Sequence, residues 1–368
     1  MKNSAAQEPA SPGKCLFSEL TKRGMTQSEL AVRTGVSAKH ISTVINDAKK
    51  ISASFARKLD IALGDESGTW LARQTDYDNR MAEIEEKNNI TEEEKAAYKK
   101  MSDVAGYFIE RNFMRNNCGI AEKIIQLRKL LCVSDLTSIP KITYSAAYRA
   151  QIANSTAVSP YVLFAWQRLC EIETGETKTA ARFDAGRLRE SIPEIKKQMF
   201  ESDAMTMSEN LRNIFSECGV AFGIVRHFRG APVQGFIKRT DAGKAILCVT
   251  FRGKSADRFW FTLFHEIGHL VNGDLNNRFV DFDSVKSETE DAADLFARDA
   301  LIGRRQYEKI IDSEKYANLS DIKRFAKDIG VPHWILIGRL HKDEWLDWKC
   351  FSREIPKFEW ENISSSNA

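Results

Sequence analysis

The segment His265-Glu266-Ile267-Gly268-His269 carries the residue types best suited to chemistry in this chain of 368 residues. Its two histidines are four residues apart, so on an α-helix both imidazoles lie on one face and can hold a single ion. Zinc held by three protein groups keeps a water molecule whose pKa falls to about 7. Glu266 can take a proton from that water and pass it to a leaving amine. The segment therefore predicts a zinc-dependent endopeptidase site.

A third ligand is expected from Glu290-Asp291-Ala292-Ala293-Asp294, which opens a later helix. Glu290 and Asp294 are four residues apart and share a helical face. We expect Glu290, in preference to Glu288, to complete the site, and Asp294 to accept a hydrogen bond from a liganding histidine, although an ordinary surface aspartate would also explain it. One zinc per chain is predicted, with another divalent ion as the alternative. The alternative to a metal site is a buried histidine pair whose side chains are satisfied by helix packing and salt bridges.

The elements around this segment are expected to alternate between strand and helix. Three β-rich runs at 219–228, 233–239 and 244–251 predict a small antiparallel sheet. Helical patterns follow at 256–272, 288–301 and 321–329. The run 244–251 is a candidate sheet edge that could hold an extended peptide, or an edge that the chain simply covers. His227, Tyr307 and His333 are alternative oxyanion donors, and a structural role is the favoured interpretation of each.

Near the N-terminus, residues 25–47 predict a helix-turn-helix. Thr26 and Ser37 can cap two helices, and Gly35 suits the turn between them. Nine Lys and Arg against four Asp and Glu over residues 14–64 suit a polyanion such as operator DNA. A helical hairpin used for protein contacts is the alternative. The residues expected to meet base edges are Ala38, Lys39, Ser42, Thr43 and Asn46, and those expected to meet phosphates are Gln27, Ser37 and Lys49.

Two resemblances are specific enough to name. Phe259-Trp260-Phe261-Thr262-Leu263-Phe264 before the HEIGH segment, the later run 290–302 and the tail 325–340 resemble the ImmA/IrrE family of metallopeptidases. That resemblance covers roughly residues 205–345 and implies cleavage of a repressor. The family usually has Glu where this chain has Ala292 and Pro where it has Gly303. Residues 25–47 resemble Xre-type helix-turn-helix proteins. The extension 56–59, 70–71 and 74–78 resembles HigA-type antitoxins.

These resemblances imply a regulator that acts as a homodimer on operator DNA, with a protein substrate (a repressor or partner protein) and, in a toxin–antitoxin or phage-related locus, a toxin as partners. Composition and spacing themselves show no toxin partner. One reading is a DNA-binding regulator with an active zinc endopeptidase domain. The other is a HigA-like antitoxin or repressor whose metallopeptidase-like domain senses a ligand or partner without significant proteolysis.

The expected fold class is α+β and mostly helical. Seven scattered cysteines without CxxC spacing fit a reducing cytoplasm, and no apolar run is long enough to predict a membrane partner. The expected parts are a disordered leader (1–13), an all-α helix-turn-helix domain (14–75), a charged linker or exposed helix (76–102), a helical middle region (103–205), a zincin-like domain with a small antiparallel sheet and the HExxH helix (206–345), and a C-terminal tail (346–368).

Overall fold

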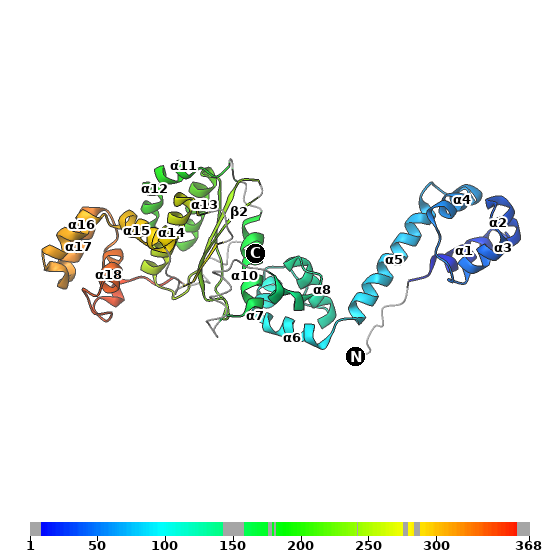
Figure 1. Cartoon of the computed structure of the whole chain (residues 1–368), viewed down its shortest axis with the longest axis horizontal. Helices are drawn as coiled ribbons and strands as arrows, with labels where there is room; N and C mark the ends of the chain where they lie inside the picture. The colour runs from blue at the N-terminus through cyan, green and yellow to red at the C-terminus, as the bar shows by residue number, and fades with distance from the viewer. Residues whose placement is uncertain are drawn as a thin grey trace. The chain divides into compact units, whose positions relative to one another are not determined.

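The computed structural model describes residues 9–142, 158–175, 179, 182–240, 242–274, 279–282 and 288–358. The chain divides into two compact units, Met1–Glu92 with Cys118–Ile125 and Glu93–Asn117 with Gln126–Ala368. The predicted class is confirmed, because helices dominate and one small sheet is present (Figure 1). Among the residues described, no helix is both long enough and apolar enough to cross a lipid bilayer.

Within its described residues, the first unit contains five complete helices: α1 Pro12–Lys22, α2 Gln27–Thr34, α3 Ala38–Ile45, α4 Ala53–Leu63 and α5 Thr69–Asn88. Their core is built around Leu16, Leu30, Ile41, Leu59 and Trp70, all fully buried. One side chain from each helix meets at this core, so burial of these apolar faces holds the short helices together.

Order begins before residue 14, where the leader was expected to end. Ser11 is buried, and its hydroxyl accepts a hydrogen bond from the backbone N–H of Lys14 at 3.2 Å. The same hydroxyl donates to Asp47 at 2.7 Å. Residues 11–13 are therefore part of the first unit, because Ser11 caps α1 and ties it to the end of α3.

The charged stretch 76–102 is largely helical, but it is not the wholly exposed segment that was expected, because Ala97 and Met101 are buried. It contains the end of α5 and all of α6 (Glu92–Lys100). Asp76 and Arg80 form an ion pair at 3.0 Å one turn apart. Glu, Lys and Arg have high helix propensity and pair at this spacing, so a weakly apolar sequence can still be helical.

From residue 102 to the sheet the described chain is helical, as predicted for the middle region. Its helices are α7 Ser102–Glu110, α8 Ile120–Leu131, α10 Pro160–Gly175, α11 Ala185–Glu190, α12 Ile192–Lys197 and α13 Ala204–Glu217, with 3-10 turns η1 Leu136–Lys141 and η2 Gln198–Phe200.

The sheet has four strands, β1 Val220–Ile224, β2 Val233–Arg239, β3 Ala245–Val249 and β4 Phe279–Phe282, in the order β1-β3-β2-β4. β2 pairs antiparallel with β3 and β4, but β1 pairs parallel with β3. The expectation of a purely antiparallel sheet is therefore wrong for β1. The expectation that 244–251 forms a sheet edge is also wrong, since β3 is paired on both sides. A β-rich run identifies a strand but not its neighbours.

Helices cover both faces of this sheet. α10 packs on one face, and α13 with α14 (Ala256–Asn272) packs on the other (Figure 1). Alternate residues separate the two faces: Phe222 and Leu247 join the core beneath α14, whereas Cys248 approaches Cys170 of α10. The β2 residue Phe236 contacts Trp166 of α10, which leaves its neighbour Gly235 on the α14 side.

After the sheet the chain is again helical. The elements are α15 Glu288–Leu301, α16 Arg304–Asp312, α17 Leu319–Ile329 and α18 His333–Lys342, with 3-10 turns η4 Lys315–Ala317 and η5 Ser352–Glu354. The helices predicted at 256–272, 288–301 and 321–329 are confirmed. In the predicted tail, Leu346 belongs to the core and Phe358 stacks on Phe251 at 4.8 Å. Residues 359–368 lie outside the described part.

Candidate metal centre and helix-turn-helix surface

α14 places the HEIGH segment in the core of the second unit. Ser255 is the N-cap of the helix and Asp257 lies in its first turn. Gly273, in the left-handed conformation with φ 89°, ends the helix. Every residue from Thr262 to Val271 is buried, because the helix packs on the sheet on one side and on α15 on another. The two histidines therefore project from a rigid element that is held on both sides.

Glycine in the middle of this segment lets α15 approach α14. A Cβ at Gly268 would lie 3.1 Å from Ala293 Cα and 3.2 Å from its carbonyl oxygen. The two backbones are thus in near contact, which brings the first turn of α15 over the histidines. At the other end of α15, the ammonium of Lys196 donates to the carbonyls of Ala300 and Leu301, at 2.8 and 3.0 Å. Burial lowers the pKa of this lysine.

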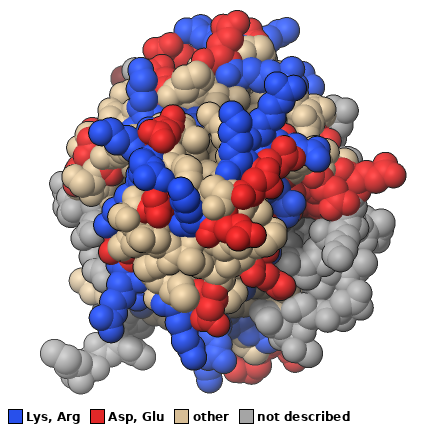
Figure 2. Space-filling view, turned by 90° about the vertical axis from the view of Figure 1, so that its left-hand side faces the viewer, with Lys and Arg blue, Asp and Glu red and all other residues tan. Residues whose placement is uncertain are grey.

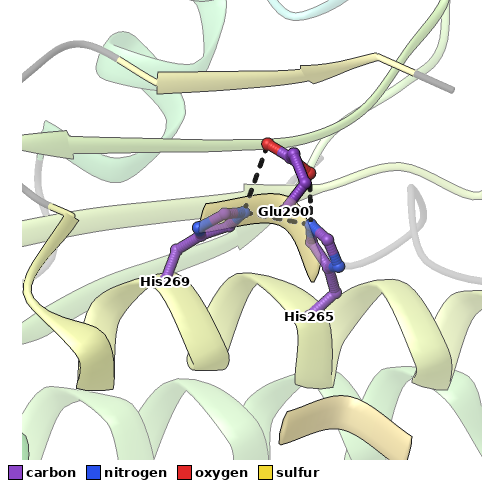
Figure 3. Close-up of side chains that lie close together, drawn as sticks. All are labelled: His265, His269 and Glu290. Atoms are coloured by element: carbon purple, nitrogen blue, oxygen red, sulfur yellow. Dashed lines mark hydrogen bonds and ion pairs between the residues drawn. The ribbon is translucent and has the colours of Figure 1, made fainter. Parts of the chain in front are cut away.

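His265, His269 and Glu290 converge on one point (Figure 3). The two histidine Nε2 atoms are 3.0 Å apart, and carboxylate oxygens of Glu290 lie 3.1 Å from His265 Nε2 and 3.6 Å from His269 Nε2. Two ligand atoms on a tetrahedral zinc ion, each about 2.0–2.1 Å from it, are separated by about 3.3 Å. The three side chains therefore have the spacing that one zinc ion requires.

Both histidines are oriented by carboxylates behind them. His265 Nδ1 donates to Asp294 at 2.8 Å, and His269 Nδ1 donates to Asp274 at 2.9 Å. These bonds place the Nδ1 proton away from the cluster and turn Nε2 toward it. Asp294 lies where it was predicted. Asp274 was not among the predicted residues, although it follows Gly273 at the end of the helix, about one turn beyond His269.

The electrostatics of the cluster favour an ionised glutamate. Burial by itself would raise the pKa of Glu290, but hydrogen bonds from His265 and His269 outweigh it and lower that pKa to about 2. Burial would likewise lower the pKa of His269, but its bonds to Glu290 and Asp274 and the charge of Glu266 outweigh it and raise that pKa. Without a cation, the raised pKa of His269 favours its positively charged form, and a bound metal ion would replace that charge.

Glu266 is fully buried between α14 and β2. A Cβ on Gly235 would overlap the carboxylate of Glu266 and lie 2.6 Å from its Cγ. Only glycine at this position of β2 leaves room for the glutamate, a role that a lone glycine in a β-rich run does not reveal. Next to it, Gln234 accepts a hydrogen bond from Thr262 at 2.7 Å, which ties β2 to α14 beside the site.

A cavity of about 550 Å³ opens beside the cluster and is lined by His265 and Glu290. Its walls come from α14, α15 and α18. Among the described residues that line it, none is His227, Tyr307 or His333, the three candidate oxyanion donors. His333 pairs with Glu354 at 3.0 Å, and Tyr307 packs under Arg339, so both side chains have structural contacts.

The predicted helix-turn-helix is formed by α2 and α3. Thr26 and Ser37 cap them by accepting hydrogen bonds from the backbones of Glu29 and His40, as predicted. Gly35, with φ 64°, forms the turn in the left-handed conformation that its type favours. The residues predicted to contact DNA are all exposed or half-buried. They are Gln27, Ser37, Ala38, Lys39, Ser42, Thr43, Asn46 and Lys49.

The side chains of this set differ in how free they are. Thr43 donates to the carbonyl of His40 at 2.7 Å, and Asn46 donates weakly to Ser42 at 3.4 Å. Lys39 and Lys49 are exposed. Both lysines can therefore reach a phosphate without breaking a hydrogen bond. Asn46 would exchange its weak hydrogen bond to Ser42 for one to DNA. Their contact with DNA stays a prediction.

Comparison with known proteins bears on this first unit. A family model described as helix-turn-helix matches residues 18–71, which lie within the predicted domain 14–75. No curated protein matches the chain. The matched region spans α2, α3 and α4, the helices whose caps, turn and exposed face have just been described. The N-terminal part of this chain is therefore a DNA-binding helix-turn-helix domain of the kind that transcriptional regulators carry.

Proposed function

We propose that the chain is a transcriptional regulator whose second unit is a zinc-dependent endopeptidase acting on a repressor or partner protein. The observation that carries the proposal is the convergence of His265, His269 and Glu290, whose ligand atoms all lie within 4.8 Å of one another, with Glu266 next to the first histidine. Three protein ligands leave one tetrahedral position open, as in catalytic zinc sites. The ImmA/IrrE resemblance of the same segments supports the same reading.

In this proposal His265, His269 and Glu290 hold the zinc ion, and Asp294 and Asp274 fix the two imidazole rings. When bound, zinc polarises a water molecule and the carbonyl of the peptide to be cleaved. Glu266 accepts a proton from the attacking water and transfers it to the leaving amine. The apolar packing of α14 keeps bulk water from Glu266, and Gly235 makes the space that its carboxylate occupies.

A metal analysis combined with a cleavage screen tests this function. Purified protein is expected to hold about one zinc per chain. His265→Ala should lose the ion, whereas Glu266→Gln should keep it and lose cleavage of this protein and of the products of neighbouring genes. Carefully prepared wild-type protein without a divalent ion would refute the metal centre. Protein with zinc but no cleavage would refute the peptidase and leave the metal centre in place.

A second candidate is a HigA-like antitoxin or repressor whose metal-binding unit responds to a ligand or partner without proteolysis. The helix-turn-helix match favours regulation as the output, and Ala292 and Gly303 depart from the peptidase resemblance. Glu266→Gln separates the two candidates. If operator release in cells depends on this glutamate, proteolysis carries the signal; if release is unchanged but His265→Ala abolishes it, the metal unit is a sensor.

A further inference from the structure

The cavity beside the candidate metal centre is lined by four basic side chains (Arg258, Arg298, Arg339 and Lys342) as well as by four acidic ones. We propose that it binds an acidic stretch of peptide and that Arg298 receives a substrate carboxylate. The proposal rests on the peptidase function and specifies its substrate class: an extended segment with Asp or Glu about three to five residues from the bond that is cleaved.

The position of Arg298 follows from the helix that supplies the third ligand. Glu290, Asp294 and Arg298 are spaced four residues apart on α15, and all three line the cavity. At 1.5 Å per residue, Arg298 lies about 12 Å along the helix from Glu290. An extended peptide covers about 12 Å with three to four residues, and the long arginine side chain adds reach. A substrate carboxylate several residues from the metal would therefore meet this guanidinium.

Two of the four cations that line the cavity are available to a ligand. Arg339 pairs with Asp343 at 2.5 Å, and Arg258 stacks over Trp348 at 5.6 Å. In the described part of the chain, neither Arg298 nor Lys342 has a carboxylate within ion-pairing distance. A half-buried arginine without a partner is costly unless water or a ligand satisfies its donors. A bidentate carboxylate is the group that best matches its geometry.

The acidic groups of the same lining are mostly engaged elsewhere. Glu290 and Asp294 bond to His265, and Asp257 accepts from Ser255. The fourth acidic residue of the lining, Asp291, is exposed. Apolar residues complete the lining and suit the side chains of a peptide; they are Phe261, Leu301, Ile302, Ile335 and Trp348. The cavity therefore fits an acidic peptide better than a nucleic acid.

The helices that follow α15 carry an excess of positive charge. Residues 304–342 contain nine Lys and Arg against five Asp and Glu, an excess of four, whereas the whole chain carries +3. Figure 2 views the second unit from its α16–α17 end and shows many Lys and Arg side chains on that face, with acidic side chains between them. Such a field attracts acidic segments from solution, and its effect weakens as salt is added.

The test uses the full chain and a set of fluorogenic peptides of one sequence, in which Glu, Gln or Lys is placed three to five residues from the cleaved bond. Wild-type protein should cleave the Glu peptide with a kcat/KM about tenfold above that for the Gln peptide, as expected for a hydrogen-bonded ion pair. Arg298→Gln should reduce this ratio to near one, and Arg298→Lys should keep part of it. Arg305→Gln removes the same charge outside the cavity and should leave the ratio unchanged.

Binding of the labelled Glu peptide to zinc-loaded Glu266→Gln tests the pocket without cleavage, so the two proposals can fail separately. Cleavage without any preference for Glu refutes the acidic pocket and leaves the peptidase in place. Charge-selective binding by Glu266→Gln with no cleavage by wild-type protein refutes the peptidase and retains the pocket. An equal loss of the ratio in Arg298→Gln and Arg305→Gln also refutes the pocket. So does an oligonucleotide that displaces the labelled peptide as well as unlabelled peptide does.

Discussion

The substitution Gly235→Ala tests whether β2 makes the space for the buried carboxylate of Glu266. The three atoms nearest to the added methyl group all belong to that glutamate, and Cγ would lie only 2.6 Å away. Glu266 is fully buried, so it cannot swing into solvent without moving α14 away from the sheet. The carboxylate must therefore leave its position, whereas none of these three nearest atoms belongs to the candidate ligands His265, His269 and Glu290.

Two magnitudes follow from this geometry. An extra methyl group in a packed core costs about 1–3 kcal/mol of folding free energy. Displacing a general base removes about 10²–10⁴-fold from the rate of the reaction that it assists. Gly235→Ala should therefore lower kcat by at least about 100-fold, lower the free energy of unfolding by about 1–3 kcal/mol, and leave about one zinc per chain.

A double-mutant cycle measures the steric part without any activity. Glu266→Ala removes the Cγ, Cδ and Oε1 atoms that the methyl group would meet. In that background Gly235→Ala should cost little, so urea unfolding should show a coupling energy of about 1–2 kcal/mol. Gly223→Ala in β1 is the matched control, because its methyl group would meet Thr174 at 3.1 Å and not the site. Its cost should add to that of Glu266→Ala. Additive costs for Gly235→Ala, or unchanged kcat, would refute the reasoning.

Three further results are expected. Asp274→Asn should weaken zinc binding about 10–100-fold in a chelator competition, since Asp274 orients His269; unchanged affinity would show that the ring is fixed without it. In zinc-stripped protein, the raised pKa of His269 contributes stability below pH 6.5 that is lost as pH rises through that pKa, and the lowered pKa of Glu290 contributes stability above pH 4.5 that is lost toward pH 2. Thermal unfolding should therefore show this contribution at its maximum between pH 4.5 and 6.5, and the maximum should be missing in His269→Ala. Lys49→Ala should weaken binding to all DNA sequences and reduce its salt dependence, whereas Thr43→Ala should change preference at particular base pairs; equal effects on operator and random DNA would contradict the role of Thr43.

Local patterns in the sequence were enough to predict most of the helices and the cluster of candidate ligands. The spacing of His265 and His269 requires only a helix to bring their rings together, and Glu290 with Asp294 repeats that spacing on the next helix. The caps at Thr26 and Ser37 and the turn at Gly35 depend on residues within a few positions of one another. Such features are set by short-range hydrogen bonds and helical periodicity, which a sequence displays directly.

Strand pairing and the contacts between residues distant in the chain were decided only by the tertiary structure. The parallel pairing of β1 with β3 could not be predicted, because a strand pattern does not specify its neighbour. Gly235 and Glu266 meet only because β2 lies under α14. Arg298 faces the proposed peptide pocket only because α15 and α18 enclose a cavity. Asp274 joins the site because α14 ends at Gly273, which turns the chain back toward His269. Packing between elements, which no local pattern records, created each of these contacts.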